Sequence, residues 1–259
     1  MTPALALAEW EAFFAVWRTR LRMDMLFNRI PVVVAAGMDF EARIARGPGI
    51  NVVYGQDRKT FIEQLYCSAG SGVGGVISFG IGGGLSPYLR AGDVIVANKV
   101  ITPNGVFETC PDWTQALLNA LPHAYHMPVF GADGPVVTVL EKRALWHATG
   151  AGTADMESGA AATVAFDHEL PYAVLRVVLD PHDRPIPLSA LAGAQKDGKT
   201  DAAAVARALL RRPGDFPALL RLAEDTRRAT QALFRSRQAL GLLPSFALPE
   251  TRKLAVDME

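Results

Sequence analysis

The stretch Val76-Ile77-Ser78-Phe79-Gly80-Ile81-Gly82-Gly83-Gly84 joins a mainly apolar run to a cluster of glycines. Short apolar runs without regular polar alternation are typical of strands that are covered on both faces. We therefore predict a strand over residues 76–79. Glycines that directly follow a strand allow a tight turn and bring backbone N–H groups close to a ligand. Two interpretations of residues 80–84 stay open here: a plain turn, and a loop that binds a ligand.

Similar patterns lie on both sides of this stretch. Strands are predicted over residues 32–36, 52–54, 93–97, 136–139 and 172–178, and helices over residues 59–67 and 158–167. Strands that alternate with helices indicate an α/β protein with a largely parallel or mixed sheet. Near the end of the chain, a helix over residues 201–211, the breaker Pro213-Gly214 and a longer helix through residue 240, capped by Asp215, predict an added helical hairpin.

These elements predict one α/β domain with additions at both ends. The predicted parts are an N-terminal amphipathic helix (1–27), a core (28–200), a helical extension of the same domain (201–243) and a tail (244–259). Residues 181–200 contain three prolines and form a loop long enough to suggest a lid.

The N-terminal helix is predicted from aromatic and leucine residues that recur at spacings of three and four. They are Leu7, Trp10, Phe14, Trp17 and Leu21. With Arg18, Arg20 and Arg22, this aromatic face suits a membrane interface. Packing against the domain or a partner subunit is an equally open interpretation, as is a true start at Met23 or Met25.

Composition excludes several classes of function. The 259 residues carry 26 Lys and Arg against 26 Asp and Glu, so no broad basic field exists to bind nucleic acid. Cys67 and Cys110 lack metal-ligand spacing and are predicted to be reduced, buried thiols, so neither a disulfide nor a metal site is expected. No apolar stretch approaches the ~20 residues that span a bilayer, and no signal peptide is evident. We expect a cytoplasmic protein, with peripheral contact to the inner membrane left open.

Acidic residues stand where ligands often bind in α/β proteins. Asp155-Met156-Glu157-Ser158 opens an alanine-rich helix, where a carboxylate either stabilises the first turn by roughly 0.3–1 kcal/mol or faces a cleft and binds a ligand hydroxyl. Asp39 and Glu41 follow the first strand, and Asp180 ends the strand of residues 172–178. The carboxyl ends of strands are where α/β sheets bind ligands. An acid at the end of a buried apolar strand favours a functional role for Asp180.

Two basic residues near Asp180 have less certain roles. Arg176 lies within the same strand and is either an edge charge or a buried partner that orients a carboxylate. His182 borders Asp180, and its role stays open. The other four histidines show no catalytic or metal spacing and are interpreted as structural or exposed.

The order of these features resembles the superfamily of purine nucleoside phosphorylases and methylthioadenosine/adenosylhomocysteine nucleosidases. The resemblance covers residues 31–185. It rests on a G-M-x-x-E element at Gly37, a G-x-x-G-G-L element at Gly80, an acidic M-E turn at Met156 and an R-x-x-x-D strand end at Arg176. Hopanoid-associated phosphorylases are the most similar group, and that likeness extends into the hairpin. It implies a three-layer α/β/α fold with a central mixed sheet, and the release of adenine from adenosylhopane by a homo-oligomer.

The resemblance also implies a role for each site residue. Asp180 would protonate or hydrogen-bond adenine N7, and Glu41 would activate water if the reaction is hydrolytic. Glu157 and Met156 would hold the ribose hydroxyls. The remaining substrate contacts implied are Gly80, Ile81, Gly82, Gly83 and Arg176. No cofactor is implied. Inorganic phosphate is a possible co-substrate, for which Arg43 and Gly80 are the candidate ligands and Arg46 a substitute.

Departures from the family pattern bear on the chemistry. Ile81 stands where phosphorolytic relatives carry a serine for phosphate, and Ser78 occupies the site of an arginine. Both changes weaken phosphate binding, because a phosphate dianion needs compensating donors when it leaves water. They favour hydrolysis, while the family name favours phosphorolysis. Leu179 replaces the serine that usually precedes the catalytic aspartate of nucleosidases, which puts the positioning of adenine in doubt.

Two alternative functions remain open. One is a nucleosidase for small substrates of the methylthioadenosine type. The other is a non-catalytic nucleotide-binding or membrane-peripheral module on the same scaffold.

Overall fold

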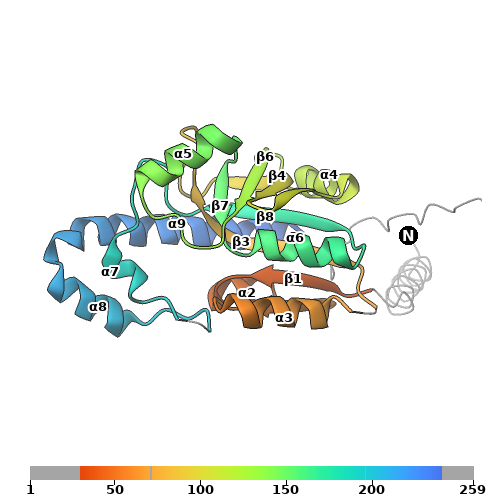
Figure 1. The fold of residues 1–259 in the computed structure, drawn as a ribbon, viewed down its shortest axis with the longest axis horizontal. Helices are drawn as coiled ribbons and strands as arrows, with labels where there is room; N and C mark the ends of the chain where they lie inside the picture. Colours follow the sequence, from red (N-terminus) through yellow and green to blue (C-terminus); the bar gives the residue numbers. More distant parts are fainter. Residues whose placement is uncertain (1–29, 71, 196, 241–259) are drawn as a thin grey trace, which may run out of the picture. The chain divides into compact units, whose positions relative to one another are not determined.

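The computed structural model describes residues 30–70, 72–195 and 197–240 (Figure 1). All of these except Ile30 belong to one compact unit that begins at Pro31. The predicted N-terminal helix, the tail and the end of the helical extension lie outside the described residues.

The described residues form a mixed sheet. Its strands are β1 (Val32–Ala36), β2 (Ile50–Tyr54), β3 (Gly75–Gly84), β4 (Val94–Thr102), β5 (Gly105–Glu108), β6 (Tyr125–Gly131), β7 (Thr153–Asp155) and β8 (Tyr172–Val178). Their order is β2-β1-β3-β7-β6-β4-β5, and β8 pairs with both β3 and β4. The pairings of β3, β7, β6, β4 and β8 therefore close into a ring. Within it β3 and β8 are parallel and β4 and β8 antiparallel, which confirms a mixed sheet.

Helices cover the sheet on both faces (Figure 1). They are α2 (Asp39–Ala45), α3 (Arg58–Ser68), α4 (Pro111–Ala120), α5 (Val139–Thr149), α6 (Ser158–Asp167), α7 (Leu188–Leu191), α8 (Ala202–Arg211) and α9 (Phe216–Leu240). Phe61 and Leu65 of α3 share one core cluster with α6, whereas Trp113 of α4 and Leu233 of α9 share the other. Burying such side chains contributes about 1.5–3 kcal/mol each, which holds the layers together. The predicted three-layer α/β/α fold is confirmed.

The C-terminal hairpin also forms where it was predicted. Asp201 caps α8 by accepting the Ala204 N–H at 2.9 Å. A short 3₁₀ turn, η1 (Pro213–Asp215), then leads into α9. Asp215, expected to cap that helix, accepts the backbone N–H of Ser189 at 3.2 Å instead. This bond ties the start of α9 to the segment that contains α7.

Two predictions about local structure are wrong. Residues 136–139 are not a strand but the approach to α5, where Thr138 accepts the Glu141 N–H at 3.1 Å and Glu141 accepts the Thr138 N–H at 2.8 Å. This capping box fixes a helix start despite the β-branched sequence. Cys67 is exposed, not buried, because it lies on the outer side of α3.

The glycines of residues 80–84 are also not a turn. They are the second half of β3, where Gly80 pairs with Arg176 and Gly82 with Val178 of β8, and Gly83 pairs with Ala154 of β7. Glycine is depleted in strands in general, so the sequence indicated a break. Both a plain turn and a ligand-binding loop are therefore wrong as descriptions of the backbone of residues 80–84, which is a continuous strand.

One observation concerns membranes. None of the helices in the described part of the chain combines the length and apolar character needed to cross a bilayer.

Candidate functional site

A cavity of about 590 Å³ lies where several strands of the core end. Its lining includes residues that directly follow β1 and β8, together with Ile81 and Gly83 of β3. Glu41, Glu157 and Asp180, three carboxylates from distant parts of the sequence, line it. The structure therefore brings together the acidic residues that the sequence singled out.

Glu41 projects from the first turn of α2 and is 1% exposed. Its Oε2 accepts the N–H groups of Gly37 (2.8 Å) and Met38 (2.7 Å), and its Oε1 accepts the N–H of Ile81 at 2.6 Å. Burial raises the pKa of Glu41, while Arg176 and the three N–H donors oppose that rise. Because Oε1 accepts only one of these N–H groups, it keeps a lone pair for a water molecule or a ligand.

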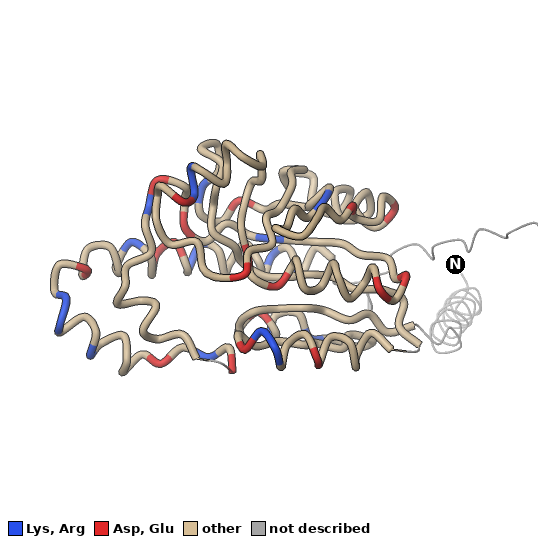
Figure 2. Tube along the Cα trace, viewed as in Figure 1, with Lys and Arg blue, Asp and Glu red and all other residues tan. Residues whose placement is uncertain are grey.

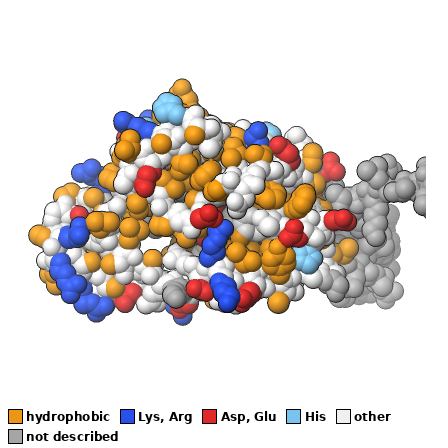
Figure 3. All heavy atoms as spheres, in the orientation of Figure 1, with side chains coloured by type: hydrophobic (Ala, Val, Ile, Leu, Met, Phe, Trp, Pro, Cys, Tyr) orange, Lys and Arg blue, Asp and Glu red, His pale blue; other side chains and the backbone are white. Residues whose placement is uncertain are grey.

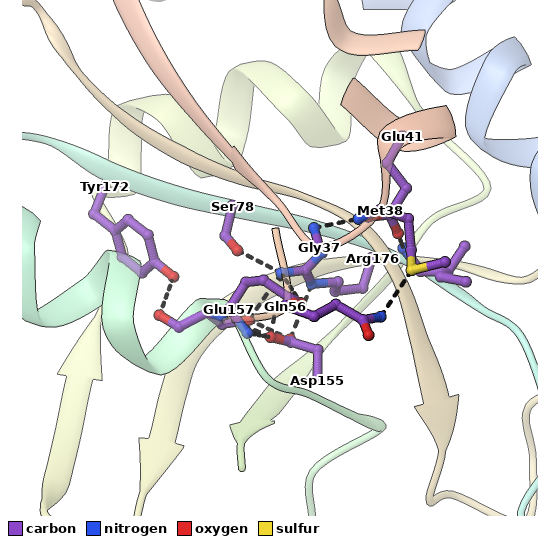
Figure 4. Close-up of polar contacts among 11 residues, drawn as sticks. Gly37, Met38, Glu41, Gln56, Ser78, Asp155, Glu157, Tyr172 and Arg176 are labelled. Carbon is purple, nitrogen blue, oxygen red and sulfur yellow. Dashed lines mark hydrogen bonds and ion pairs between the residues drawn. The ribbon is translucent and has the colours of Figure 1, made fainter. Parts of the chain in front are cut away.

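Arg176 contacts two carboxylates of the acidic turn, Asp155 and Glu157 (Figure 4). It is fully buried, with Nε 2.9 Å from Asp155 Oδ2 and Nη2 2.5 Å from Ser78 Oγ. Nη2 also lies 3.6 Å from Glu157 Oε2. A buried guanidinium needs such partners, since an unpaired buried charge is strongly destabilising. Arg176 is absent from the cavity lining, so it acts on the site through Asp155 and Glu157.

Asp155 also shapes the turn. Its Oδ1 accepts the N–H groups of Glu157 (2.9 Å) and Ser158 (2.6 Å), which begins α6. The predicted capping role of Asp155 is thus observed, together with its ion pair to Arg176. Fixed from both sides, the turn presents Met156 and Glu157 to the cavity.

Asp180 is 2% exposed and is held by Lys142 of α5. The Lys142 ammonium contacts Asp180 Oδ2 and also donates to the carbonyl oxygens of Pro181 (3.0 Å) and Arg184 (2.7 Å). Asp180 Oδ1 is buried without a hydrogen-bond partner in the described structure. One carboxyl oxygen is therefore fixed, and the other remains available to a ligand in the cavity.

The environment of the carboxyls favours their protonated forms. Burial raises the pKa of Asp180 to about 6, although Lys142 lowers it. Burial also raises the pKa of Glu157 to about 8, against the effect of Arg176 and with further repulsion from Asp155 and Glu41. Perturbed carboxyls that share a cavity are typical of sites for acid–base chemistry.

Two glycines permit this dense packing. A Cβ on Gly37 would lie 2.4 Å from Glu157 Oε1. A Cβ on Gly80 would lie 2.5 Å from both Arg176 Nη1 and Glu41 Oε1. A Cβ closer than 3.0 Å would force its neighbour to shift, and these neighbours are charged side chains held by hydrogen bonds or ion pairs, so glycine at both positions leaves room for them.

The remainder of the cavity is apolar. Its walls come from the segment that contains α7 and from the inner faces of α8 and α9, through Ile186, Leu191, Val205, Leu219, Leu222 and Ala223. Val205 is partly buried, and Leu219 and Leu222 follow at helical spacing. The predicted hairpin and the proline-rich loop thus extend the cavity beyond its acidic end.

The other residues named from the sequence divide into two groups. Met156, Ile81 and Gly83 line the cavity, whereas Gly80 and Gly82 do not. Arg43, the candidate phosphate ligand, is 67% exposed and pairs with Asp39 at 2.7 Å. Arg43 and Arg46 are likewise absent from the lining.

Lys142 is the main residue that sequence reasoning missed. A lysine three positions after Val139 carries no pattern of its own, because most helical lysines are solvated. Only its burial against Asp180 reveals its role. Gln56 was also missed, because nothing in its sequence surroundings marks it. It lines the cavity and donates to Met38 Sδ at 2.9 Å.

The sequence of the chain also matches a known protein family. The pattern of the phosphorylase superfamily matches residues 58–211, which is more than half of the chain. The chain belongs to the phosphorylase superfamily. The matched region of this superfamily member includes Lys142, Glu157 and Asp180 but neither Glu41 nor α9. No curated protein sequence matches the chain.

Solved structures share the superfamily fold at low sequence identity. A 5'-methylthioadenosine/S-adenosyl homocysteine nucleosidase from Campylobacter jejuni has a TM-score of 0.53 and 11% identity, covering 80% of this chain and 98% of its own. The Helicobacter pylori nucleosidase bound to butyl-thio-DADMe-Immucillin-A has a TM-score of 0.54 and 16% identity, covering 81% and 98%. Futalosine hydrolase of Helicobacter pylori strain 26695 has a TM-score of 0.54 and 16% identity, and the match covers 81% of this chain and 97% of the hydrolase. At these identities the likeness concerns the fold alone.

Proposed function

We propose that this chain cleaves the N-glycosidic bond of a purine nucleoside by hydrolysis. The observation that carries the proposal is the arrangement of Asp180, whose Oδ2 is fixed by Lys142 while Oδ1 has no partner and Asp180 lines the cavity. A carboxyl with a raised pKa can carry a proton to a leaving group. Asp180 is the general acid of this proposal and protonates the base at N7.

The other two carboxyls complete the proposed mechanism. Glu157, together with Met156, binds the ribose hydroxyls as the sugar becomes oxocarbenium-like. Glu41 uses the free lone pair on Oε1 to orient and deprotonate the attacking water. The C–N bond breaks as Asp180 gives its proton to the base, and a C–O bond forms to water. General acid–base groups of this kind typically contribute ~10²–10⁴-fold each.

The charge of the cavity favours water over phosphate as the nucleophile. Among the described residues that line it, none is a lysine, arginine or histidine. Ser78, at the position of a family arginine, is fully buried and bonded to Arg176. A phosphate dianion would therefore lose its hydration without a cation to replace it.

The apolar walls guide the choice of substrate. A cavity that joins an acidic end to an apolar extension suits a nucleoside with a large apolar 5′ substituent. Adenosylhopane, the substrate assigned to the hopanoid-associated group that the sequence resembles, has this chemistry. Adenosylhopane is therefore the proposed substrate, and release of its adenine would be a step in the synthesis of hopanoid side chains.

A base-release assay tests both the reaction and the substrate. Purified full-length protein is given adenosylhopane or methylthioadenosine, each with and without inorganic phosphate. We expect adenine and free sugar from adenosylhopane at a rate that phosphate does not change. A sugar 1-phosphate product would show phosphorolysis, and faster cleavage of methylthioadenosine would support the small-substrate nucleosidase. Failure to release base from any purine nucleoside would overturn the proposed activity.

A further inference from the structure

The turn between α8 and α9 carries exposed apolar side chains that the cavity does not use. Leu210 is 85% exposed, Leu220 is 56% exposed and Phe216 is 51% exposed. None of the three lines the cavity, whose walls use Val205, Leu219 and other residues of the same helices. We call residues 207–221 the hairpin tip. Its helices thus have two apolar faces, one toward the cavity and one toward the outside.

The hairpin tip is also basic. It contains four arginines, Arg207, Arg211, Arg212 and Arg221, and one acid, Asp215, in a chain whose net charge is zero. Arg207 lies 3.8 Å from Asp201 and is 66% exposed. The side chains of the other three form no hydrogen bond or ion pair with any residue that the structure describes. Figure 2 shows basic positions along the α8–α9 end of the chain, and Figure 3 shows hydrophobic and basic side chains next to one another there.

From this combination we infer that the hairpin tip docks on an anionic lipid surface. Exposed apolar side chains in a cluster indicate a binding partner, since scattered single residues would not need one. Leucine and phenylalanine can enter the boundary between headgroups and acyl chains while arginines bind lipid phosphates. Charge complementarity favours this partner, because the four arginines of the hairpin tip outnumber its one acid and lie in the same short segment as the exposed apolar side chains.

Docking at this tip is separate from bond cleavage. The tip residues contact neither Glu41, Glu157 nor Asp180, and their test needs no substrate. The same helices nevertheless line the apolar end of the cavity, so a docked tip would place that end near the lipid. A substrate with an apolar 5′ substituent could then pass between bilayer and cavity.

Vesicle co-sedimentation of the full-length protein tests the inference. The vesicles contain phosphatidylcholine alone or phosphatidylcholine mixed with phosphatidylglycerol. We expect binding to the anionic vesicles that weakens as salt is added, because salt screens exposed charges. In the variant Arg211→Glu/Arg212→Glu, binding should fall by roughly tenfold or more, since each basic residue near an anionic surface contributes measurably.

Matched variants separate docking from general effects of charge and folding. Arg143→Glu/Arg235→Glu reverses two exposed arginines outside the tip and should bind like the wild type. Leu210→Ser/Phe216→Ser should weaken binding while the charge is kept. Thermal unfolding midpoints of all variants should stay close to that of the wild type, because these side chains are exposed.

Two outcomes would overturn the inference. Unchanged vesicle binding in both tip variants would mean that another part of the chain, such as residues 1–29, contacts lipid. Absence of vesicle binding, together with self-association that the tip variants abolish in analytical ultracentrifugation, would make the tip an interface between copies of the chain.

Discussion

Burial decides what each carboxyl of the site can do. Asp180 and Glu141 are both acids near Lys142, yet burial raises the pKa of Asp180 to about 6 while hydrogen bonds from Thr138 lower that of exposed Glu141. The difference is desolvation, which disfavours the charged form of a buried acid. Of these two residues, we therefore expect Asp180 and not Glu141 to donate a proton.

Replacing Asp180 tests its role as the acid. Asp180→Asn should reduce base release by roughly 10²–10⁴-fold, because an amide cannot supply the proton. It should also destabilise the fold by about 3–5 kcal/mol, since Lys142 is left as an unpaired buried charge. The double variant Asp180→Asn/Lys142→Met should recover much of that stability but none of the activity. Near-normal turnover in either variant would remove Asp180 from the mechanism.

Lys142 should set the pH dependence of the reaction. Activity that needs protonated Asp180 should decline as the pH rises above about 6. Lys142 lowers the pKa of Asp180, so Lys142→Met should raise that pKa and move the alkaline limb of the kcat/KM profile upward. The comparison is made on base release across pH in folded protein. An alkaline limb that stays in place would show that Lys142 only supports the loop.

At the scale of elements, β3 shows why the sequence pattern was misleading. Its glycines look like a break, but β7 and β8 pair with them, and Arg176 and Glu41 pack where side chains would stand. Glycine in this strand is a packing requirement and not a source of flexibility.

A methyl group at Gly80 should therefore be costly. Gly80→Ala would place Cβ 2.5 Å from Arg176 Nη1 and Glu41 Oε1, and these two buried side chains would have to leave their hydrogen bonds to make room. We expect a loss of about 1–3 kcal/mol in the free energy of unfolding, as for other overpacked sites. Gly214→Ala is the matched control, because a Cβ there meets nothing within 4 Å. Equal stability of the two variants in urea unfolding would contradict this account.

The loop after β8 is fixed more firmly than its length suggests. Lys142 holds the Pro181 and Arg184 carbonyls from α5, and the Arg184 side chain pairs with buried Asp225 of α9. Gly198 O accepts the Asp39 N–H at 3.0 Å farther along. The predicted lid is thus tied at several points, and its contribution to the cavity comes from Ile186, Leu191 and their neighbours.

At the scale of the whole molecule, the buried acids should make stability depend on pH. Consider a carboxyl whose pKa is higher in the folded state than in the unfolded state. Its contribution to stability is fully present below the unfolded-state pKa, and it is lost as the pH rises through the folded-state pKa. For Glu157 this window runs from 4.5 to about 8. The free energy of unfolding contributed by this residue should fall across that range.

Isosteric variants measure this effect. Glu157→Gln removes the ionisation, so its stability relative to the wild type should increase from pH 5 to pH 9. Glu141→Gln is the control of opposite sign, because the lowered pKa of Glu141 contributes stability that is lost as the pH falls. Urea unfolding at several pH values checks both. Parallel curves for Glu157→Gln and wild type would show that Glu157 titrates normally.

Local sequence patterns determined much of the fold. Apolar runs, unbroken in β1 and interrupted by Arg176 in β8, predicted these two strands; the alanine-rich run predicted α6, and Asp201 with Pro213-Gly214 predicted the limits of α8. These features act within a few residues, so periodicity and capping are enough to predict them. Strand β6 was missed because its Tyr-His-Met-Pro sequence lacks such a pattern and is a strand only through its pairing with β4 and β7.

The sequence by itself also determined that Glu41 and Asp180 follow strands and that Glu157 opens a helix, in an order that resembles a known superfamily. Only the tertiary structure decided that Glu41, Glu157 and Asp180 share one cavity, that buried Arg176 pairs with its acidic turn, and that Arg43 lies outside it. It alone revealed Lys142. The physical reason is that desolvation and pairing depend on what surrounds a charge in space, and partners such as Lys142 and Asp180 are separated by 37 residues of chain.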